Sequence, residues 1–353
     1  MDIGFNKRDI EKSLNDLTEA FNDFRKNIKP LGKSLSEINK IIKGIKKDNI
    51  LEVEKENIIK NIKTLIIPDV HCRDFYKEPL MYVLEKLSDV NVVFLGDYLD
   101  GYSHEWMEGM SGRFSCDYSR KGIDNLKEII ELKKKYNKRI ILLLGNHDLT
   151  YIYGTKFCKC RTDYINWGEI YNLFKENIGL FKICHDEIIN NKRIVYSHSG
   201  FNKMWENTIY EVLNVEKTTD KDEPINCDIL NDLFIKSVDY FYKNGDKGNV
   251  YKDDMFNILS DMSYLRGGYA SYGSIVWGDI RDFSDSYINE KLDNEALFND
   301  VIQVVGHTQL ENMAVSIRGK IFDLDVRQCF YIDDKAIIRY YNTDKNVWYN
   351  DGK

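Results

Sequence analysis

Five short polar clusters in this chain carry the residue types that bind metal ions and move protons. Each cluster directly follows a run of apolar residues, and together the clusters contain four of the six histidines. They are Asp69-Val70-His71, Gly96-Asp97-Tyr98-Leu99-Asp100, Gly145-Asn146-His147-Asp148, Ser197-His198-Ser199-Gly200 and Gly306-His307-Thr308-Gln309. Carboxylate, imidazole and amide groups are metal ligands, and so many of them brought together would suit a pair of ions.

The apolar runs before the clusters have the length and the β-branched composition of buried strands. They are Leu65–Ile67, Val92–Leu95, Ile140–Leu144, Ile194–Tyr196 and Val301–Val305. Polar residues at the carboxyl ends of strands lie where open α/β sheets bind their ligands. We therefore expect the five clusters to meet at one edge of a sheet and to form a metal site there.

The order of the clusters resembles the calcineurin-like metallophosphoesterase superfamily, whose pattern is DxH, GDxxD, GNH[DE], a histidine and then GH. The resemblance extends over residues 64–325. It implies an α/β protein in which a two-sheet β-sandwich is flanked by helices. It also implies a metal-dependent hydrolase of phosphoric esters.

The resemblance implies six metal ligands, and one of the carboxylates bridges two ions. The implied ligands are Asp69, His71 and Asp97 at the first ion, and Asp97, Asn146, His198 and His307 at the second. Oxygen and imidazole donors of this kind suit manganese, which is our first expectation, and also iron or zinc. Two ions about 3.5–4 Å apart can hold a hydroxide between them that attacks phosphorus.

His147 and Asp100 are implied to be catalytic residues rather than ligands. His147 corresponds to the acid that protonates the leaving alcohol, and Asp100 would orient it by accepting a hydrogen bond from its other ring nitrogen. Asp100 could instead cap the turn before Gly101. Asn146 is expected to contact the substrate as well as a metal ion.

Two positions depart from the patterns of relatives within the superfamily. Gly101 stands where many phosphoprotein phosphatases have an arginine, so we consider Arg73 and Arg266 as residues that bind the phosphate group. Either arginine could instead pair with a structural carboxylate. Gln309 replaces the final histidine of a GHxH ending and is a further candidate ligand. That ending resembles the phosphoprotein phosphatase and diadenosine-tetraphosphate hydrolase branch.

Residues 1–62 lack the pattern of strands and polar clusters and have heptad spacing of their apolar residues instead. We expect an α-helical arm. Pro30 and Gly32 favour two helices, over 7–28 and 35–47, rather than one rod. The arm could fold as a hairpin on the rest of the chain, or it could pair with another copy to form a homo-oligomer.

The rest of the chain, residues 63–353, is expected to form the catalytic domain. Its expected features are crossover helices at 80–87 and 123–135, cap insertions around 151–180 and 201–270, a hairpin over 183–197, and antiparallel strands of the second sheet at 321–325, 328–333 and 335–341. The cap insertions are expected to select the substrate.

The composition narrows the setting in which the protein works. Its 57 acidic and 50 basic residues give a net charge of −7, which is not typical of proteins that bind nucleic acids in general. This net charge does not exclude a local basic groove. Seven cysteines without a framework of spacings indicate a reducing compartment. We see no secretory signal and no apolar run near the ~18 residues of a membrane span. We expect a cytoplasmic protein, bacterial or from a phage in its host cell, that binds no membrane.

The leading functional hypothesis is a dinuclear-metal phosphomonoesterase that acts on phosphoserine, phosphothreonine or a nucleotide-type phosphate. The first alternative is a phosphodiesterase or nuclease acting on nucleic acid or on a cyclic nucleotide. The second is a metal-stabilised scaffold that works through its helical arm. The presence of both Asp100 and His147 argues against a scaffold, because a purely structural metal site has no use for that pair.

Overall fold

The computed structural model describes residues 61–101, 116–154, 157, 160–215, 224–244, 252–283, 298, 300–310 and 314–341. The expected helical arm lies outside these residues, apart from its last two positions. Ile62 begins the first strand, so the description of the fold starts where the arm was expected to end.

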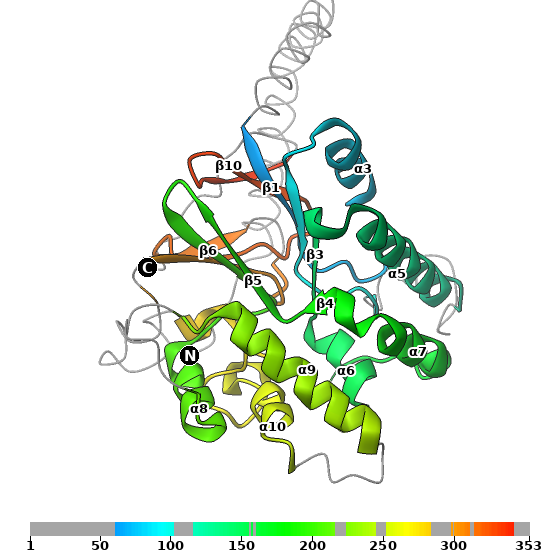
Figure 1. Ribbon diagram of the computed structural model, residues 1–353, viewed down its shortest axis with the longest axis vertical. Helices are drawn as coiled ribbons and strands as arrows, with labels where there is room; N and C mark the ends of the chain where they lie inside the picture. Colours follow the sequence, from blue (N-terminus) through cyan, green and yellow to red (C-terminus); the bar gives the residue numbers. More distant parts are fainter. Residues whose placement is uncertain are drawn as a thin grey trace, which may run out of the picture. The chain divides into compact units, whose positions relative to one another are not determined.

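Two β-sheets form the centre of the described chain (Figure 1). The first has the order β11-β10-β1-β2-β3-β4 and the second β5-β6-β7-β9-β8. The strands of the first sheet are β1 (Ile62–Ile67), β2 (Asn91–Phe94), β3 (Ile140–Leu143), β4 (Phe181–Lys182), β10 (Phe330–Asp333) and β11 (Ile338–Tyr340). Those of the second are β5 (Cys184–Ile189), β6 (Lys192–Ser197), β7 (Val301–Val305), β8 (Val315–Ile317) and β9 (Ile321–Asp323).

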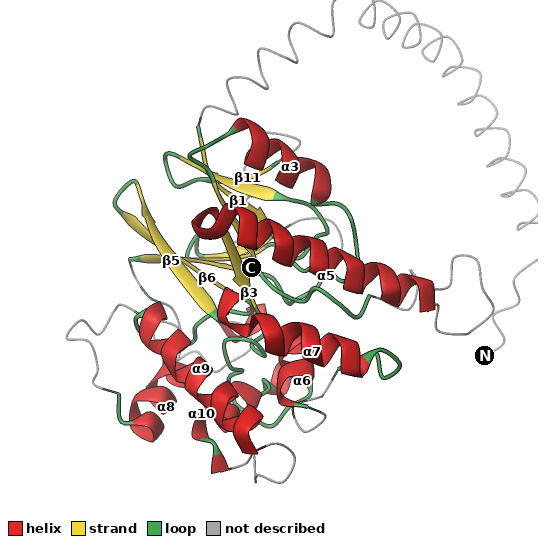
Figure 2. Ribbon diagram, turned by 45° about the vertical axis from the view of Figure 1, so that its right-hand side comes forward, coloured by secondary structure: helices red, strands yellow, loops and turns green. Residues whose placement is uncertain are grey.

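Strands β1 to β4 are parallel because the chain returns through helices between them. The helix α3 (Lys77–Lys86) joins β1 to β2, and α5 (Cys116–Tyr136) lies between β2 and β3 (Figure 2). Both predicted crossover helices are confirmed. On α5, buried side chains three or four residues apart form one apolar stripe: Ile123, Leu126, Ile129 and Ile130.

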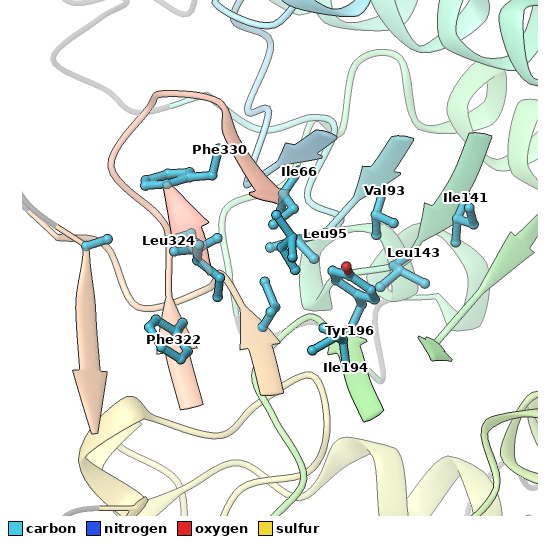
Figure 3. Close-up of a cluster of buried hydrophobic side chains, with 14 of the residues drawn as sticks. Ile66, Val93, Leu95, Ile141, Leu143, Ile194, Tyr196, Phe322, Leu324 and Phe330 are labelled. Carbon is cyan, nitrogen blue, oxygen red and sulfur yellow. The ribbon is translucent and has the colours of Figure 1, made fainter. Parts of the chain in front are cut away.

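The main hydrophobic core lies between the two sheets (Figure 3). In the first sheet Ile66, Val93 and Ile141 occupy neighbouring register positions, and they point toward Ile194 and Tyr196 of the second. Alternate residues of the same strands are also buried, on the opposite face of the first sheet. Burial on both faces explains why these strands read as unbroken apolar runs rather than as alternating ones.

The C-terminal strands correct one prediction. We expected all three segments to complete the second sheet as antiparallel strands. The first segment, β9, does join the second sheet, where it pairs antiparallel to β8 and parallel to β7. The other two are antiparallel strands, but β10 and β11 join the first sheet, where β10 runs antiparallel to β1. The apolar pattern could not separate these arrangements, because each inner face is buried against the other sheet and both faces give the same sequence signal.

The hairpin between β5 and β6 is confirmed. Asn190 and Asn191 form its loop with φ angles of 51° and 59°. Asparagine tolerates this left-handed backbone better than most residues, and two such residues match the twist of the paired strands.

Helices and short turns occupy the regions of the expected cap insertions. The helices there are α7 (Trp167–Asn177), α8 (Lys203–Leu213), α9 (Cys227–Asn244) and α10 (Asp254–Ser260), with the 3₁₀ turns η2 (Ile178–Leu180) and η5 (Tyr264–Arg266). The helix α6 (Asn146–Tyr153) ends within the first of these regions, and the 3₁₀ turns η1 (Asn137–Arg139) and η6 (Ile280–Phe283) lie outside both. Tyr153 of α6 ties three of the helices together, because its ring contacts Phe234 of α9 and Phe256 of α10. None of the helices in the described part of the chain is long and apolar enough to cross a membrane.

Candidate metal centre

The six predicted ligands lie together, buried, where the carboxyl ends of strands from both sheets meet. Each of the six is at most 4% exposed: Asp69, His71, Asp97, Asn146, His198 and His307. The first four follow β1, β2 and β3 of the first sheet, and the two others follow β6 and β7 of the second. The expectation of a single sheet edge was therefore wrong, since the clusters come from two sheets.

The donor atoms around His198 have the spacing of ligands that share an ion. Its Nε2 lies 3.0 Å from Asn146 Oδ1, 3.0 Å from His307 Nδ1 and 3.4 Å from Asp97 Oδ2. Two ligand atoms that each lie about 2.1 Å from one ion, at a right angle, are about 3.0 Å apart. This donor set therefore fits a single divalent cation.

A second group of donors shares Asp97 with the first. His71, Asp97 and His147 place potential ligand atoms within 4.8 Å of one another, as Asp97, His198 and His307 do. His71 Nε2 is 3.6 Å from Asp97 Oδ2 and 3.9 Å from Asp69 Oδ2. Because Asp97 belongs to both groups, the geometry suits two ions with a shared carboxylate.

Backbone carbonyls orient the two histidines that face Asp97. His71 Nδ1 donates a hydrogen bond to the Leu99 carbonyl, and His198 Nδ1 donates to that of Leu95, both at 2.8 Å. At His71, which burial keeps neutral, this bond places the proton on Nδ1 and leaves Nε2 unprotonated. At His198 burial lowers the pKa, but Asp97 and Asp69 outweigh it and raise this pKa to about 10, so Nε2 would release a proton on binding a cation.

Glycines supply the space that the carboxylates occupy. A Cβ atom at Gly145 would overlap Asp97 Oδ1, and one at Gly306 would overlap Asp69 Oδ1. The glycines that precede Asn146 and His307 therefore permit the close approach of the ligand-bearing loops.

Four site residues have left-handed backbones, which is uncommon for side chains other than glycine. The φ angles are 43° at His71, 51° at Asp97, 58° at Asp100 and 72° at His307. Such conformations cost roughly 1–3 kcal/mol each and persist where surrounding structure enforces them. Here Asp148 contributes that support, because its carboxyl accepts hydrogen bonds from the backbone N–H groups of Asp97 and Gly145 at 2.8 and 2.9 Å.

The electrostatics of the centre favour bound cations. Burial lowers the pKa of His71 to about 3, and burial together with the Arg266 charge lowers the pKa of His307 well below its usual value. Both imidazoles are therefore neutral, as ligands must be. Burial raises the pKa of Asp69 to about 6, and the neighbouring charge of Asp97 adds to this rise against the opposing effect of His198. Two carboxylates buried this close together gain a counter-charge when cations bind between them.

His147 and Asp100 form the predicted pair. His147 Nδ1 donates to Asp100 Oδ2 at 2.9 Å, and the Tyr151 hydroxyl donates to Asp100 Oδ1 at 2.6 Å. Burial lowers the pKa of His147, but Asp97 and Asp100 outweigh it and raise this pKa above its ordinary value. Both carboxylate oxygens of Asp100 thus bind side chains, as an orienting residue would. His147 also lies beside His71 and Asp97 in one of the donor groups, which places its ring at the metal centre.

A pocket of about 630 Å³ opens over the centre. Of the two arginines that we considered for binding the phosphate group, one lines this pocket and the other does not. Arg266 lines it, as Gln309 does, and Arg266 Nη2 donates to the His307 carbonyl at 3.2 Å. Arg266 Nη1 also lies 3.8 Å from Asp279 Oδ2. Arg73 is half-buried and is not among the residues that line the pocket; its charge acts on Asp69 and Asp325.

Sequence reasoning missed several residues near the centre. Arg161 and Arg281 line the pocket but lie in segments without a cluster, so no local signal marked them. Asp323 and Asp325 are at most 1% exposed, and burial raises the pKa of each carboxyl well above its usual range. Asp323 is the last residue of β9 and Asp325 lies two positions later, so both come directly after apolar residues, as the five clusters do, and the same pattern could have found them.

Comparison with known proteins places these residues in a family. Residues 62–308 match the family model described as calcineurin-like phosphoesterase. Among solved structures, one similar chain is a protein serine/threonine phosphatase from Saccharomyces cerevisiae with similarity to human phosphatase PP5, at 14% identity over 81% of each chain and a TM-score of 0.37. Another is a candidate diadenosine tetraphosphatase, at 12% identity over 82% of this chain and 95% of that one, with a TM-score of 0.34. Since the family match spans most of the sequence, the chain belongs to the calcineurin-like phosphoesterase family and is a hydrolase of phosphoesters.

Proposed function

We propose that this protein is a phosphomonoesterase that works with two divalent metal ions, with phosphoserine, phosphothreonine or nucleotide-type phosphates as its substrates. The observation that carries the proposal is the position of Asp97, which belongs to both donor groups of a buried centre beside a pocket. The pocket volume of about 630 Å³ suits a small ester or a phosphorylated side chain.

The residues present fit two ions. Asp69, His71 and Asp97 would hold the first, and Asp97, Asn146, His198 and His307 the second. These ligands are oxygen and imidazole donors without sulfur, which favours manganese, with iron or zinc as alternatives. When bound, such a pair of ions activates water and neutralises the charge that develops on a transferring phosphoryl group.

The chain's own groups complete the site. Burial lowers the pKa of His147, but Asp97 and Asp100 outweigh it and favour the protonated ring, which would donate a hydrogen bond from Nδ1 to Asp100 and give the other proton, on Nε2, to the leaving alcohol. Asn146 would contact both the substrate and the second ion. Arg266 and Gln309 line the pocket near His307 and would contact the phosphate or its substituent.

Hydrolysis of p-nitrophenyl phosphate by the full-length chain, with manganese, iron, cobalt, nickel or zinc, tests the proposal. We expect metal-dependent turnover that falls by on the order of 10²-fold or more in Asp97→Ala, together with loss of bound metal. Asp124→Ala, the same change at an exposed position of α5, is the matched control and should leave both quantities unchanged. Faster hydrolysis of bis-p-nitrophenyl phosphate would replace the proposal by a phosphodiesterase, and no hydrolysis of either ester would overturn it.

A further inference from the structure

We infer that Arg161 binds the phosphate group of the substrate, an assignment that rests on the proposed function. Arg161 lines the pocket together with His71, Asn146 and His147. Its Nη2 donates a hydrogen bond to the Asp100 carbonyl at 3.0 Å. The guanidinium therefore lies at the end of the turn that carries Asp97 and Asp100, where the next residue, Gly101, offers no side chain of its own.

The chain on both sides of Arg161 is tethered, so the position of the guanidinium is prepared before a ligand arrives. On one side the Cys160 thiol contacts the Thr150 hydroxyl at 3.5 Å. On the other side the Asp163 N–H donates to the Tyr151 hydroxyl at 2.8 Å. Both tethers lead to α6, which begins at Asn146. A side chain that is already held in place loses less entropy when it binds an anion.

The other two arginines of the pocket are bound differently. Arg281 makes a two-pronged contact with Asp279, with Nε 2.7 Å from Oδ1 and Nη2 2.9 Å from Oδ2. Arg266 lies 3.8 Å from the same carboxylate. Asp279 is thus shared by the two arginines on the His307 side, whereas Arg161 lies on the His147 side of the pocket, where it contacts the Asp100 carbonyl.

The location of Arg161 sets which part of the substrate it would contact. Asp100 binds both Arg161 and His147: its backbone carbonyl accepts a hydrogen bond from Arg161, and its carboxylate accepts one from His147. A guanidinium is a planar fork of donors, so it can hold a carbonyl with one edge and phosphate oxygens with another. Arg161 would therefore bind non-bridging oxygens of the phosphate on the side from which His147 protonates the leaving group.

Calorimetric titration of the manganese-loaded full-length chain with inorganic phosphate tests the assignment without turnover. Arg161→Ala should raise the Kd of phosphate by about 10- to 100-fold, as expected for loss of a charge-assisted hydrogen-bonding group. Arg161→Lys, which keeps the charge but not the fork, should give an intermediate Kd. Arg120→Ala removes an exposed arginine of α5 that binds Glu169, and it should leave the Kd unchanged.

Two other outcomes are decisive. If both Arg161 variants bind phosphate as the wild type does, the assignment is wrong; a lower kcat at unchanged phosphate affinity would then show that Arg161 acts only by positioning Asp100. If the wild type binds phosphate but hydrolyses no ester, the proposed function fails while the comparison of phosphate affinities still decides the role of Arg161.

Discussion

Replacing Gly145 by alanine would test whether the metal centre depends on the exact approach of two loops. The backbone itself accepts the change, because Gly145 has a φ of −101° and ψ of −178°, an extended conformation open to any residue. The new methyl group, however, would overlap Asp97 Oδ1 and lie 2.6 Å from His198 Cε1. The perturbation is therefore steric and falls directly on two of the proposed ligands.

The size of the effect follows from these contacts. Ordinary contacts of a Cβ atom begin near 3.4 Å, so the His198 ring must move from 2.6 Å by about 0.8 Å, and the Asp97 carboxylate must move further. Metal–ligand distances tolerate only about 0.2 Å. Changes in groups that merely support ligands weaken metal binding by about 10- to 100-fold, or about 1.4–2.8 kcal/mol. We expect Gly145→Ala to reach at least the upper end of that range for one ion.

Manganese titration by calorimetry, with metal content measured after desalting, would report the loss. Gly168→Ala is the control: Gly168 lies in α7, and a Cβ there would have no atom within 4 Å. That variant should bind metal normally and be more stable by about 0.5–1 kcal/mol, because alanine favours a helix over glycine. Wild-type affinity and stoichiometry in Gly145→Ala would refute the view that Asp97 and His198 are ligands in their present positions.

Two further predictions concern the acid and the cap. His147→Ala should cost on the order of 10²–10⁴ in turnover of an alkyl phosphate and much less with p-nitrophenyl phosphate, whose phenolate leaves without a proton; equal losses, or a lost metal ion, would show that His147 is a ligand. Asp163→Asn should lower the free energy of unfolding by about 1 kcal/mol at pH 7, because it replaces Oδ2, which accepts hydrogen bonds from the Ser119 hydroxyl and the Asn166 side-chain amide, by a donor group. Burial raises the pKa of Asp163, but hydrogen bonds from Ser119 and Asn166 outweigh it and hold this pKa below 3.8. The stabilisation by the Asp163 carboxylate is thus present above its unfolded-state pKa and is lost as pH falls through the lower folded-state pKa. The free energies of unfolding in urea of the wild type and the variant should therefore converge below about pH 4. A constant difference between them down to about pH 3 would contradict this account.

The strand ends could be predicted because their signal is local. The apolar run that becomes β1 and the polar residues Asp69 and His71 after it are adjacent in the sequence, and the same holds for β7 and His307. The partition of the strands into two sheets could not be predicted in this way. Both sheets bury their inner faces against each other, so the choice of neighbour for β10 depends on packing between distant segments and leaves no mark in the pattern of its own residues.

The arginines that line the pocket were harder to predict than the proposed metal ligands. Arg161 lies in irregular structure and Arg281 in the short 3₁₀ turn η6, and in neither segment does a repeat of apolar residues fix the direction of a side chain. Their places depend on tertiary contacts, such as that of Arg281 with Asp279. Of the two arginines that the sequence offered, Arg73 follows a cluster directly and yet does not line the pocket, whereas Arg266 lies 41 positions before His307 and binds its carbonyl.

The placement of the centre between two sheets makes its geometry depend on how the sheets pack. His198 follows a strand of the second sheet, but its ring donates to the carbonyl of Leu95, which follows a strand of the first. The backbone N–H of His307, from the second sheet, likewise donates to both carboxylate oxygens of Asp69, from the first, at 3.1 and 3.2 Å. These bonds join the same two sheets that pack against each other in the hydrophobic core (Figure 3). If all the ligands came from one sheet, a small shift of the other sheet would leave their distances unchanged. Here a shift of either sheet would separate His198 from Asp97. The core that holds the sheets together therefore also sets the distances between the proposed ligands.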